Sequence, residues 1–208
     1  ITQAVNEMEQ AITAGDYPQY IDVNSFAAWL LAHDILGTYD SAGSNIYLTK
    51  FDDQPYSKLT MSTLWDFSSI MKTNDDWARV HSDYFYFQQL FNSKNNSFTL
   101  SYKQLWSQLS DDIFSQIEAF LDDFAVSPAA TALEASRVYD QQRWQYTAST
   151  VDENILEAKS WFSSRQAWLT HAIGHIDIAT DVATIRKNPS SFYSRLFNYT
   201  NQSNRIRR

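Results

Sequence analysis

The sequence predicts a mainly helical (α+β) domain with one small β-hairpin around residues 45–64. Three observations predict this fold class. The 208 residues are 44% hydrophobic and 15% aromatic, which is enough for the core of a single domain. Glycine and proline occur only four times each, which argues against a fold of many strands and turns. Apolar residues also recur at helical spacing through most of the chain.

The first 37 residues predict two helices. Apolar residues at helical spacing predict a helix over residues 1–14. A second helix is expected to begin at Asn24 or Ser25 and to stop at Gly37, because glycine is the residue that helix C-termini prefer. His33 lies on its apolar face and is expected to be a hydrogen-bonded core residue.

Two short strand-like runs follow, at residues 45–51 and 57–64. The connection "DDQPY" between them is rich in residues that form turns. We therefore expect these runs to pair as a hairpin.

The second half of the chain predicts only helices. A helical pattern resumes at Asn74, and two separate helices are expected over residues 98–109 and 112–124. Asp111 and Asp112 would lie at the N-terminus of the second helix, where the helix dipole favours negative charge.

Two further helices complete the predicted fold. One begins at Pro128, a residue suited to the first helical position, and reaches about Tyr146. The other begins after Thr150, which forms a capping box with Glu153, and continues towards Ile173. The sequence thus predicts six or seven helices and an embedded hairpin.

Charge divides the chain into two predicted parts. The tail 186–208 contains six Lys or Arg residues and no Asp or Glu, so it carries +6 and residues 1–185 carry −14. An acidic body repels nucleic-acid phosphates, so no nucleic-acid partner is expected. The tail either binds an anion or, more simply, packs on its own acidic body or frays as a terminus.

Several classes of protein are excluded or disfavoured by composition. The chain has no cysteine, which excludes disulfides, thiolate metal sites and a cysteine nucleophile. No apolar run of about 18 residues is present, so no transmembrane segment is expected. The opening of the chain has no signal-peptide pattern, which suggests a mature protein or a piece of a longer one.

Most other polar clusters have structural explanations. His171 and His175 are four residues apart and so share a helix face, but no glutamate or third ligand accompanies them, and we expect partly buried or surface histidines. Asp122 and Asp123 are expected to be solvated acids at a helix end. The many aromatic residues either line a sugar or peptide groove or pack in the core.

Asp40, Asn45 and Asp66 form a candidate catalytic site around the hairpin. Asp40 and Asn45 have the spacing of the catalytic Asp and the metal-binding Asn in the protein-kinase loop. There the Asp reaches a substrate hydroxyl, and the Asn turns back to hold magnesium. Asp66 follows the hairpin, as the second metal-binding Asp of kinases does. The alternative is that Asp40 and Asn45 are turn residues and that Asp66 caps the next segment.

The stretch "YIDVNSFAAWLLAHDILGTYDSAGSNIYLTK", followed by "KLTMSTLWDF", resembles the spore-coat protein H (CotH) kinase-like family. In that family an "xxDxxSF" helix leads to a D-G-x-x-x-N/S loop, a "YLY" strand, a second strand and a "WDxD" motif. The resemblance covers about residues 17–173 and is most specific over residues 20–66. Residues 156–173, "LEAKSWFSSRQAWLTHAI", look like the closing helix of the family.

The resemblance implies the helical C-lobe of a divergent protein-kinase-like fold. It implies part of an atypical kinase that transfers phosphate from ATP to Ser or Thr of a surface or coat protein. It further implies a catalytic role for Asp40, metal ligation by Asp66 and Asn45, and Mg²⁺ and ATP as cofactors. The implied location is the bacterial cell envelope, a secreted state or the spore surface.

Three departures from the family pattern qualify this interpretation. A nucleotide lobe with glycine-containing strands would precede residue 1 in the parent chain, and without it this lobe is expected to be inactive. The second acid of "WDxD" is Ser68 here, and the tail beyond Ile173 has no counterpart. The alternative function is a non-catalytic cell-surface binding or adhesion module that binds through its aromatic face.

Overall fold

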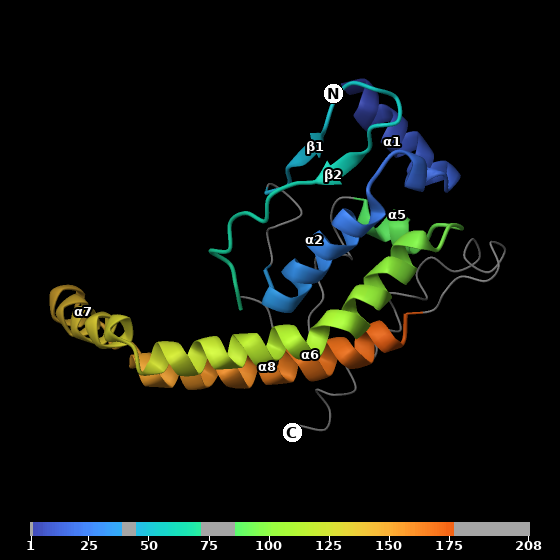
Figure 1. The fold of residues 1–208 in the computed structure, drawn as a ribbon. Helices are drawn as coiled ribbons and strands as arrows, with labels where there is room; N and C mark the ends of the chain where they lie inside the picture. The colour runs from blue at the N-terminus through green and yellow to red at the C-terminus, as the bar shows by residue number, and fades with distance from the viewer. Residues whose placement is uncertain (1, 39–44, 72–85, 177–208) are drawn as a thin grey trace.

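The computed structural model describes residues 2–38, 45–71 and 86–176. Over these ranges it contains six α-helices and one two-stranded antiparallel sheet, which confirms the mainly helical fold class (Figure 1). The elements in chain order are α1 (Thr2–Ala14), the 3₁₀ helix η1 (Tyr17–Gln19), α2 (Val23–Leu36), β1 (Leu48–Lys50), β2 (Leu59–Met61), α5 (Phe87–Phe91), α6 (Ser97–Ala125), α7 (Pro128–Trp144) and α8 (Val151–Gly174). The helix expected from Asn74 begins outside the described residues. The whole basic tail 186–208 also lies outside them.

Helices α6 and α8 lie side by side and run in opposite directions (Figure 1). Helix α7 lies at one end of this pair, where α6 finishes and α8 begins. The sheet and α1 lie towards the other end, on the far side of α2 from α6. Helix α2 therefore packs on the α6–α8 pair, and the hairpin packs on α2.

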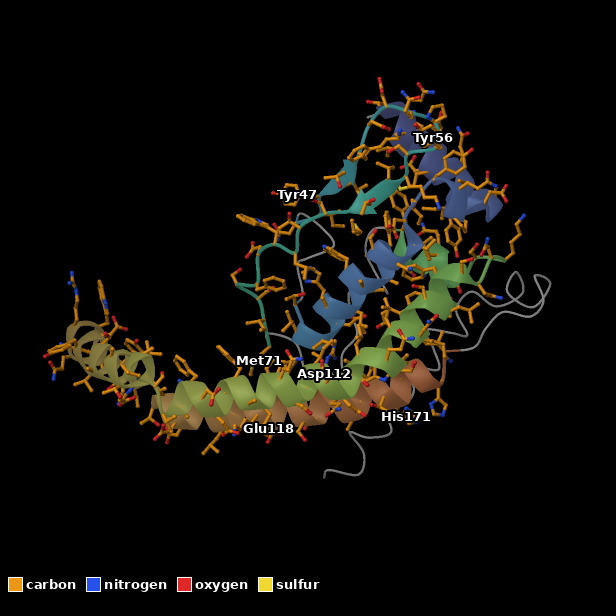
Figure 2. All side chains as sticks on the ribbon, viewed as in Figure 1. Tyr47, Tyr56, Met71, Asp112, Glu118 and His171 are labelled. Carbon is orange, nitrogen blue, oxygen red and sulfur yellow. The ribbon has the colours of Figure 1, made fainter. Side chains whose placement is uncertain are left out.

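The prediction of two helices over residues 98–109 and 112–124 is wrong, because α6 runs through both ranges without a break. Asp112 lies in the middle of α6 and not at a helix N-terminus (Figure 2). It is exposed, and its carboxylate accepts a hydrogen bond of 2.7 Å from Gln116 one turn later. Asp112 therefore interacts with a residue of its own helix, on the solvent-exposed side of a continuous α6.

Packing explains why α6 continues. The stretch between the two predicted helices contains no glycine or proline to end it. Its apolar face is also unbroken, because Trp106 and Phe114 lie edge to face with ring centroids 6.1 Å apart. Phe114 in turn meets Phe162 of α8 at 6.3 Å. Burying this face against α8 outweighs the weak helix propensity of the two Asp residues.

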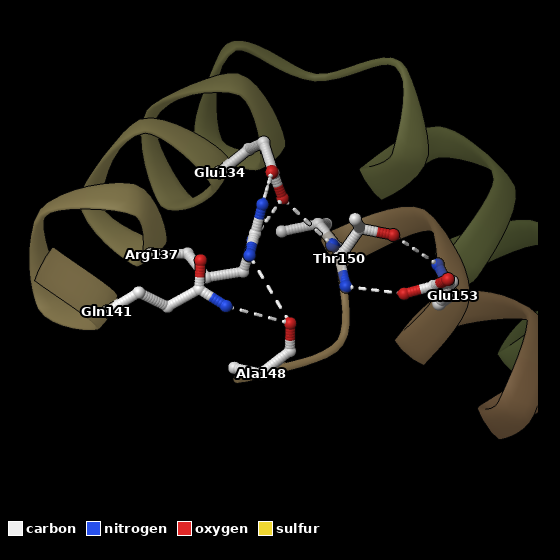
Figure 3. Close-up of polar contacts among 7 residues, drawn as sticks. Glu134, Arg137, Gln141, Ala148, Thr150 and Glu153 are labelled. Carbon is white, nitrogen blue, oxygen red and sulfur yellow. Dashed lines mark hydrogen bonds and ion pairs between the residues drawn. The ribbon is translucent and has the colours of Figure 1, made fainter. Parts of the chain in front are cut away.

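The predicted capping box at the start of α8 is confirmed (Figure 3). The Thr150 hydroxyl accepts a hydrogen bond from the Glu153 N–H at 3.1 Å, and the Glu153 carboxylate accepts one from the Thr150 N–H at 2.8 Å. The two residues thus satisfy two of the N–H groups that a helix N-terminus leaves without helical partners.

Helix α7 is fastened to the same point by Glu134 (Figure 3). Its carboxylate accepts a hydrogen bond of 3.0 Å from the N–H of Val151 and forms an ion pair with Arg137. Arg137 and Gln141 also donate hydrogen bonds to the carbonyl oxygen of Ala148, at 3.3 and 3.1 Å. These contacts fix the connection between α7 and α8.

The hairpin is shorter than predicted. Only three residue pairs form the ladder, from Leu48 opposite Met61 to Lys50 opposite Leu59. Beyond Lys50 the chain turns, and its ammonium group donates to the carbonyl oxygens of Asp52 and Gln54 at 3.0 and 2.7 Å. These bonds hold the predicted loop and end the strand before residue 51.

The hairpin is attached to the start of α2 through the "DxxSF" residues. Asp22 is the N-cap and accepts a hydrogen bond from the Ser25 N–H at 3.1 Å, so α2 begins slightly before the predicted start. The Ser25 hydroxyl accepts one from the N–H of Met61 in β2, also at 3.1 Å. Phe26 is fully buried in the core. The motif therefore starts the helix and positions the sheet against it.

None of the helices within the described ranges is both long enough and apolar enough to cross a membrane.

Candidate functional site

The C-terminal turn of α2 leads directly into the segment that contains Asp40. As predicted, α2 stops at Gly37, whose left-handed backbone (φ 62°) reverses the chain. Thr38 follows and is buried. Its side-chain oxygen lies 2.8 Å from Nδ1 of His33, which is also buried. This contact confirms that His33 is a hydrogen-bonded core residue.

The segment after β2 returns to the same turn of α2. The ring of Phe67 stacks on that of His33, with centroids 5.3 Å apart. The N–H of Met71 donates to the carbonyl oxygen of Leu36 at 3.0 Å. This segment therefore packs beside the beginning of the Asp40 segment, and it contains Asp66.

Asp66 has a left-handed backbone, with φ of 57°. This conformation is uncommon for residues other than glycine, although Asp tolerates it better than most. Strained backbone persists where the surrounding structure imposes it, and it concentrates at functional sites. Here the carboxylate turns back on its own chain, and Oδ1 accepts a hydrogen bond of 3.2 Å from the N–H of Ser68.

Hydrogen bonds lower the pKa of Asp66 below its ordinary value of 3.8. The Ser68 hydroxyl makes the largest contribution, followed by the Ser68 N–H. Burial acts in the opposite direction, and the Asn45 side chain makes the smallest contribution to the lowering. Asp66 is therefore an anion at neutral pH, and Asn45 is among the residues that favour its charged form.

The three predicted site residues are not all described. Asn45 is half-buried and lies three residues before the start of β1. Asp40 lies outside the described residues, so its position relative to Asp66 stays a prediction. Ser68 was predicted only as the position of a lost acid, and its contact with Asp66 was not predicted. The signal for that contact was its spacing, since Asp often binds the backbone two residues later.

The groups around Asp66 fit a magnesium ion. Mg²⁺ prefers oxygen ligands, and it commonly uses one or two carboxylates together with water and substrate phosphates. An ionised carboxylate can only accept hydrogen bonds, so Asn45 would approach Asp66 through its amide nitrogen, which leaves its carbonyl oxygen as a possible ligand. No group of three or more His, Cys, Asp or Glu suited to a metal occurs within the described ranges. A site of one carboxylate and one amide oxygen would be completed by water, by substrate phosphates or by residues outside these ranges.

The remaining candidates do not form such a site. His171 and His175 are both exposed at the end of α8, with rings 4.1 Å apart, as expected for surface histidines. Asp122 is an exposed acid that pairs with Lys159 of α8. Of the aromatic residues, Tyr47 and Trp65 are about half exposed and meet edge to face, with centroids 6.5 Å apart.

Comparison with known proteins supplies one match. Residues 1–169 match the CotH kinase protein family. The match begins before residue 17, where the motifs first suggested it, and so includes α1. Neither a curated protein nor a solved structure gives a significant match.

Proposed function

Because the chain belongs to the CotH kinase protein family, we propose that it carries the acidic residues of a protein kinase that uses ATP. The observation that carries this proposal is the carboxylate of Asp66, which the Ser68 N–H holds on a left-handed turn in the segment that packs on the C-terminal turn of α2. The proposed acceptor is a Ser or Thr hydroxyl of a surface or coat protein, and the proposed location is the bacterial envelope or spore surface.

The proposed reaction assigns one role to each residue. Asp40 takes the proton of the acceptor hydroxyl, whose oxygen bonds to the γ-phosphorus of ATP as the bond to the β-phosphate oxygen breaks and ADP leaves. Asp66 and Asn45 would hold Mg²⁺, which when bound neutralises charge on the phosphates. Ser68 orients Asp66 through the hydrogen bond that its N–H donates to Oδ1, and its contacts lower the pKa of Asp66.

Phosphoryl transfer depends mainly on positioning and electrostatics, so the remaining phosphate contacts matter as much as these acids. In the family pattern, basic contacts come from a nucleotide lobe. We propose that residues 1–185 act as a helical lobe together with such a lobe and transfer no phosphate alone.

A second candidate is a non-catalytic surface-binding module. Ser68 stands in place of the second acid of the family motif, which favours this alternative. Exposed Tyr47 and Trp65 offer an aromatic contact surface next to Asp66. Calorimetry distinguishes the two candidates, because only the kinase binds ATP in a magnesium-dependent manner.

The test uses three variants of the full-length protein. Asp40→Ala is expected to abolish phosphate transfer, and Asp66→Asn to abolish magnesium-dependent ATP binding, both with an unchanged circular dichroism spectrum. Asp123→Asn, at an exposed position of α6, is the control and should retain both activities. Phosphate transfer at the wild-type rate by Asp40→Ala would contradict the assignment.

A further inference from the structure

A buried arginine lies beneath the C-terminal turn of α2. Arg165 of α8 is 1% exposed and is the largest of the fully buried side chains. Its Nε donates a hydrogen bond of 2.7 Å to the backbone carbonyl oxygen of Asp34, and a second guanidinium nitrogen donates to the same oxygen. The guanidinium lies over the rings of Trp161 and Trp168, 5.7 and 5.2 Å from their centroids. A charge buried this deeply needs such partners.

Tyr102 of α6 completes the buried centre. Its hydroxyl donates a hydrogen bond of 2.7 Å to Oδ2 of Asp34, and both residues are fully buried. Burial and the negative charge of Asp34 raise the pKa of Tyr102, while the positive charge of Arg165 opposes this. Helices α2, α6 and α8 thus meet at one polar cluster of Asp34, Tyr102 and Arg165.

The cluster lies at the C-terminal turn of α2, where it supplies a partner for a backbone carbonyl group. The last four carbonyl groups of a helix have no partner within the helix, and the carbonyl of Asp34 is one of these, since α2 ends at Leu36. Arg165 supplies that partner from α8. The neighbouring carbonyls of His33 and Leu36 accept hydrogen bonds from Thr38 and Met71, at 3.3 and 3.0 Å. The same turn therefore binds α8, the beginning of the Asp40 segment and the segment that follows Asp66.

We propose that Arg165 and Tyr102 are positioning residues of the phosphotransfer site, because they fix the turn of α2 from which both acid-bearing segments are held. This inference rests on the proposed function. Buried polar clusters add little net stability compared with apolar packing, and their better-attested use is to specify one arrangement. Here the cluster would fix where Thr38 lies relative to Asp66, and Thr38 is followed two residues later by Asp40.

The test uses Arg165→Lys and Tyr102→Phe in the full-length protein. Lys keeps the charge but loses the planar fork that makes two bonds to one carbonyl oxygen, and Phe loses only the hydroxyl. A misplacement of about 1 Å can cost on the order of 100-fold in rate, so kcat is expected to fall roughly 10- to 100-fold. The KM for ATP should stay within about twofold, which marks a loss of alignment and not of binding.

A readout independent of activity is amide hydrogen exchange. Residues 33–38 and 66–71 are expected to exchange at least about tenfold faster in both variants, while α1 and α7 are unchanged. Arg143→Lys and Tyr139→Phe are the matched controls. Arg143 lies over the ring of Trp144 at 5.1 Å and Tyr139 is largely exposed, both on α7 and far from the site.

The outcomes separate this inference from the proposed function. Wild-type kcat and wild-type exchange in residues 33–38 and 66–71 of both variants would overturn the inference while leaving the kinase assignment intact. Faster exchange spread evenly over the whole chain would show a purely structural role and would also overturn it. A wild-type protein that neither binds nor consumes ATP would end the kinase assignment and the catalytic part of the inference. Hydrogen exchange would then still decide whether Arg165 and Tyr102 position the two segments.

Discussion

Substitution of Thr38 by Val tests the connection between α2 and the candidate site. Val keeps the shape of Thr but removes the hydroxyl that contacts His33 Nδ1 at 2.8 Å. Losing one partner of a buried hydrogen bond costs about 1–3 kcal/mol. The added methyl group recovers about 0.8 kcal/mol through burial. The free energy of unfolding is therefore expected to fall by about 0.2–2.2 kcal/mol.

For a chain of this length, such a change lowers the melting temperature by up to about 9 °C. Urea unfolding followed by circular dichroism measures the free energy, and calorimetry measures magnesium-dependent ATP binding, which should weaken because Phe67 stacks on the same His33 ring. Thr13→Val is the control, since Thr13 is exposed and its hydroxyl donates to the Glu9 carbonyl of its own helix. Unchanged stability and unchanged ATP affinity in Thr38→Val would refute the reasoning.

Three further predictions concern polar contacts that stabilise the fold. Hydrogen bonds from Arg137 and from the N–H of Val151 at the start of α8 lower the pKa of Glu134 from 4.5 to about 2. The ionised carboxylate therefore stabilises the fold fully above pH 4.5, and this stabilisation is lost as the pH falls towards about 2. Glu134→Gln should remove this pH dependence from hydrogen exchange in α7. Burial and the contact with Glu9 raise the pKa of Tyr86 from 10.0 to about 12. The neutral phenol therefore stabilises the fold fully below pH 10, and this stabilisation is lost between about pH 10 and 12. An ultraviolet titration compared with Tyr86→Phe should show this late ionisation, and a pKa near 10 would contradict the prediction. Thr150→Ala removes an N-cap and should lower the free energy of unfolding by about 0.5–2 kcal/mol in urea titrations, and no change would show that the capping box contributes nothing.

The parts of the fold that sequence predicted well depend on local signals. The turn at Gly37 and the capping box of Thr150 and Glu153 are properties of a few adjacent residues, and both appear as expected. The single helix α6 was missed because two consecutive Asp residues are also typical of a helix N-terminus. Only the packing of Phe114 against α8 shows that the helix continues.

The candidate site was predictable in its residue types but not in its connections. The spacing of Asn45 and Asp66 about the hairpin suggested that they share a site, and this stays a prediction; the contact that the structure adds is the hydrogen bond from Ser68 to Asp66. The left-handed backbone of Asp66 has no signal in a single sequence, since Asp also accepts ordinary conformations. Arg165 was not predicted because its partner, Asp34, lies 131 residues away.

The most direct test of the account is where a divalent cation binds in the presence of ATP. Mn²⁺ in place of Mg²⁺ broadens the NMR signals of nuclei close to it. With ATP present, the account predicts broadening centred on the amides of Asn45 and Ser68, and its loss in Asp66→Asn. Broadening centred instead on the exposed acids of α6, such as Asp112 and Asp123, with Asn45 and Ser68 unaffected, would contradict the account.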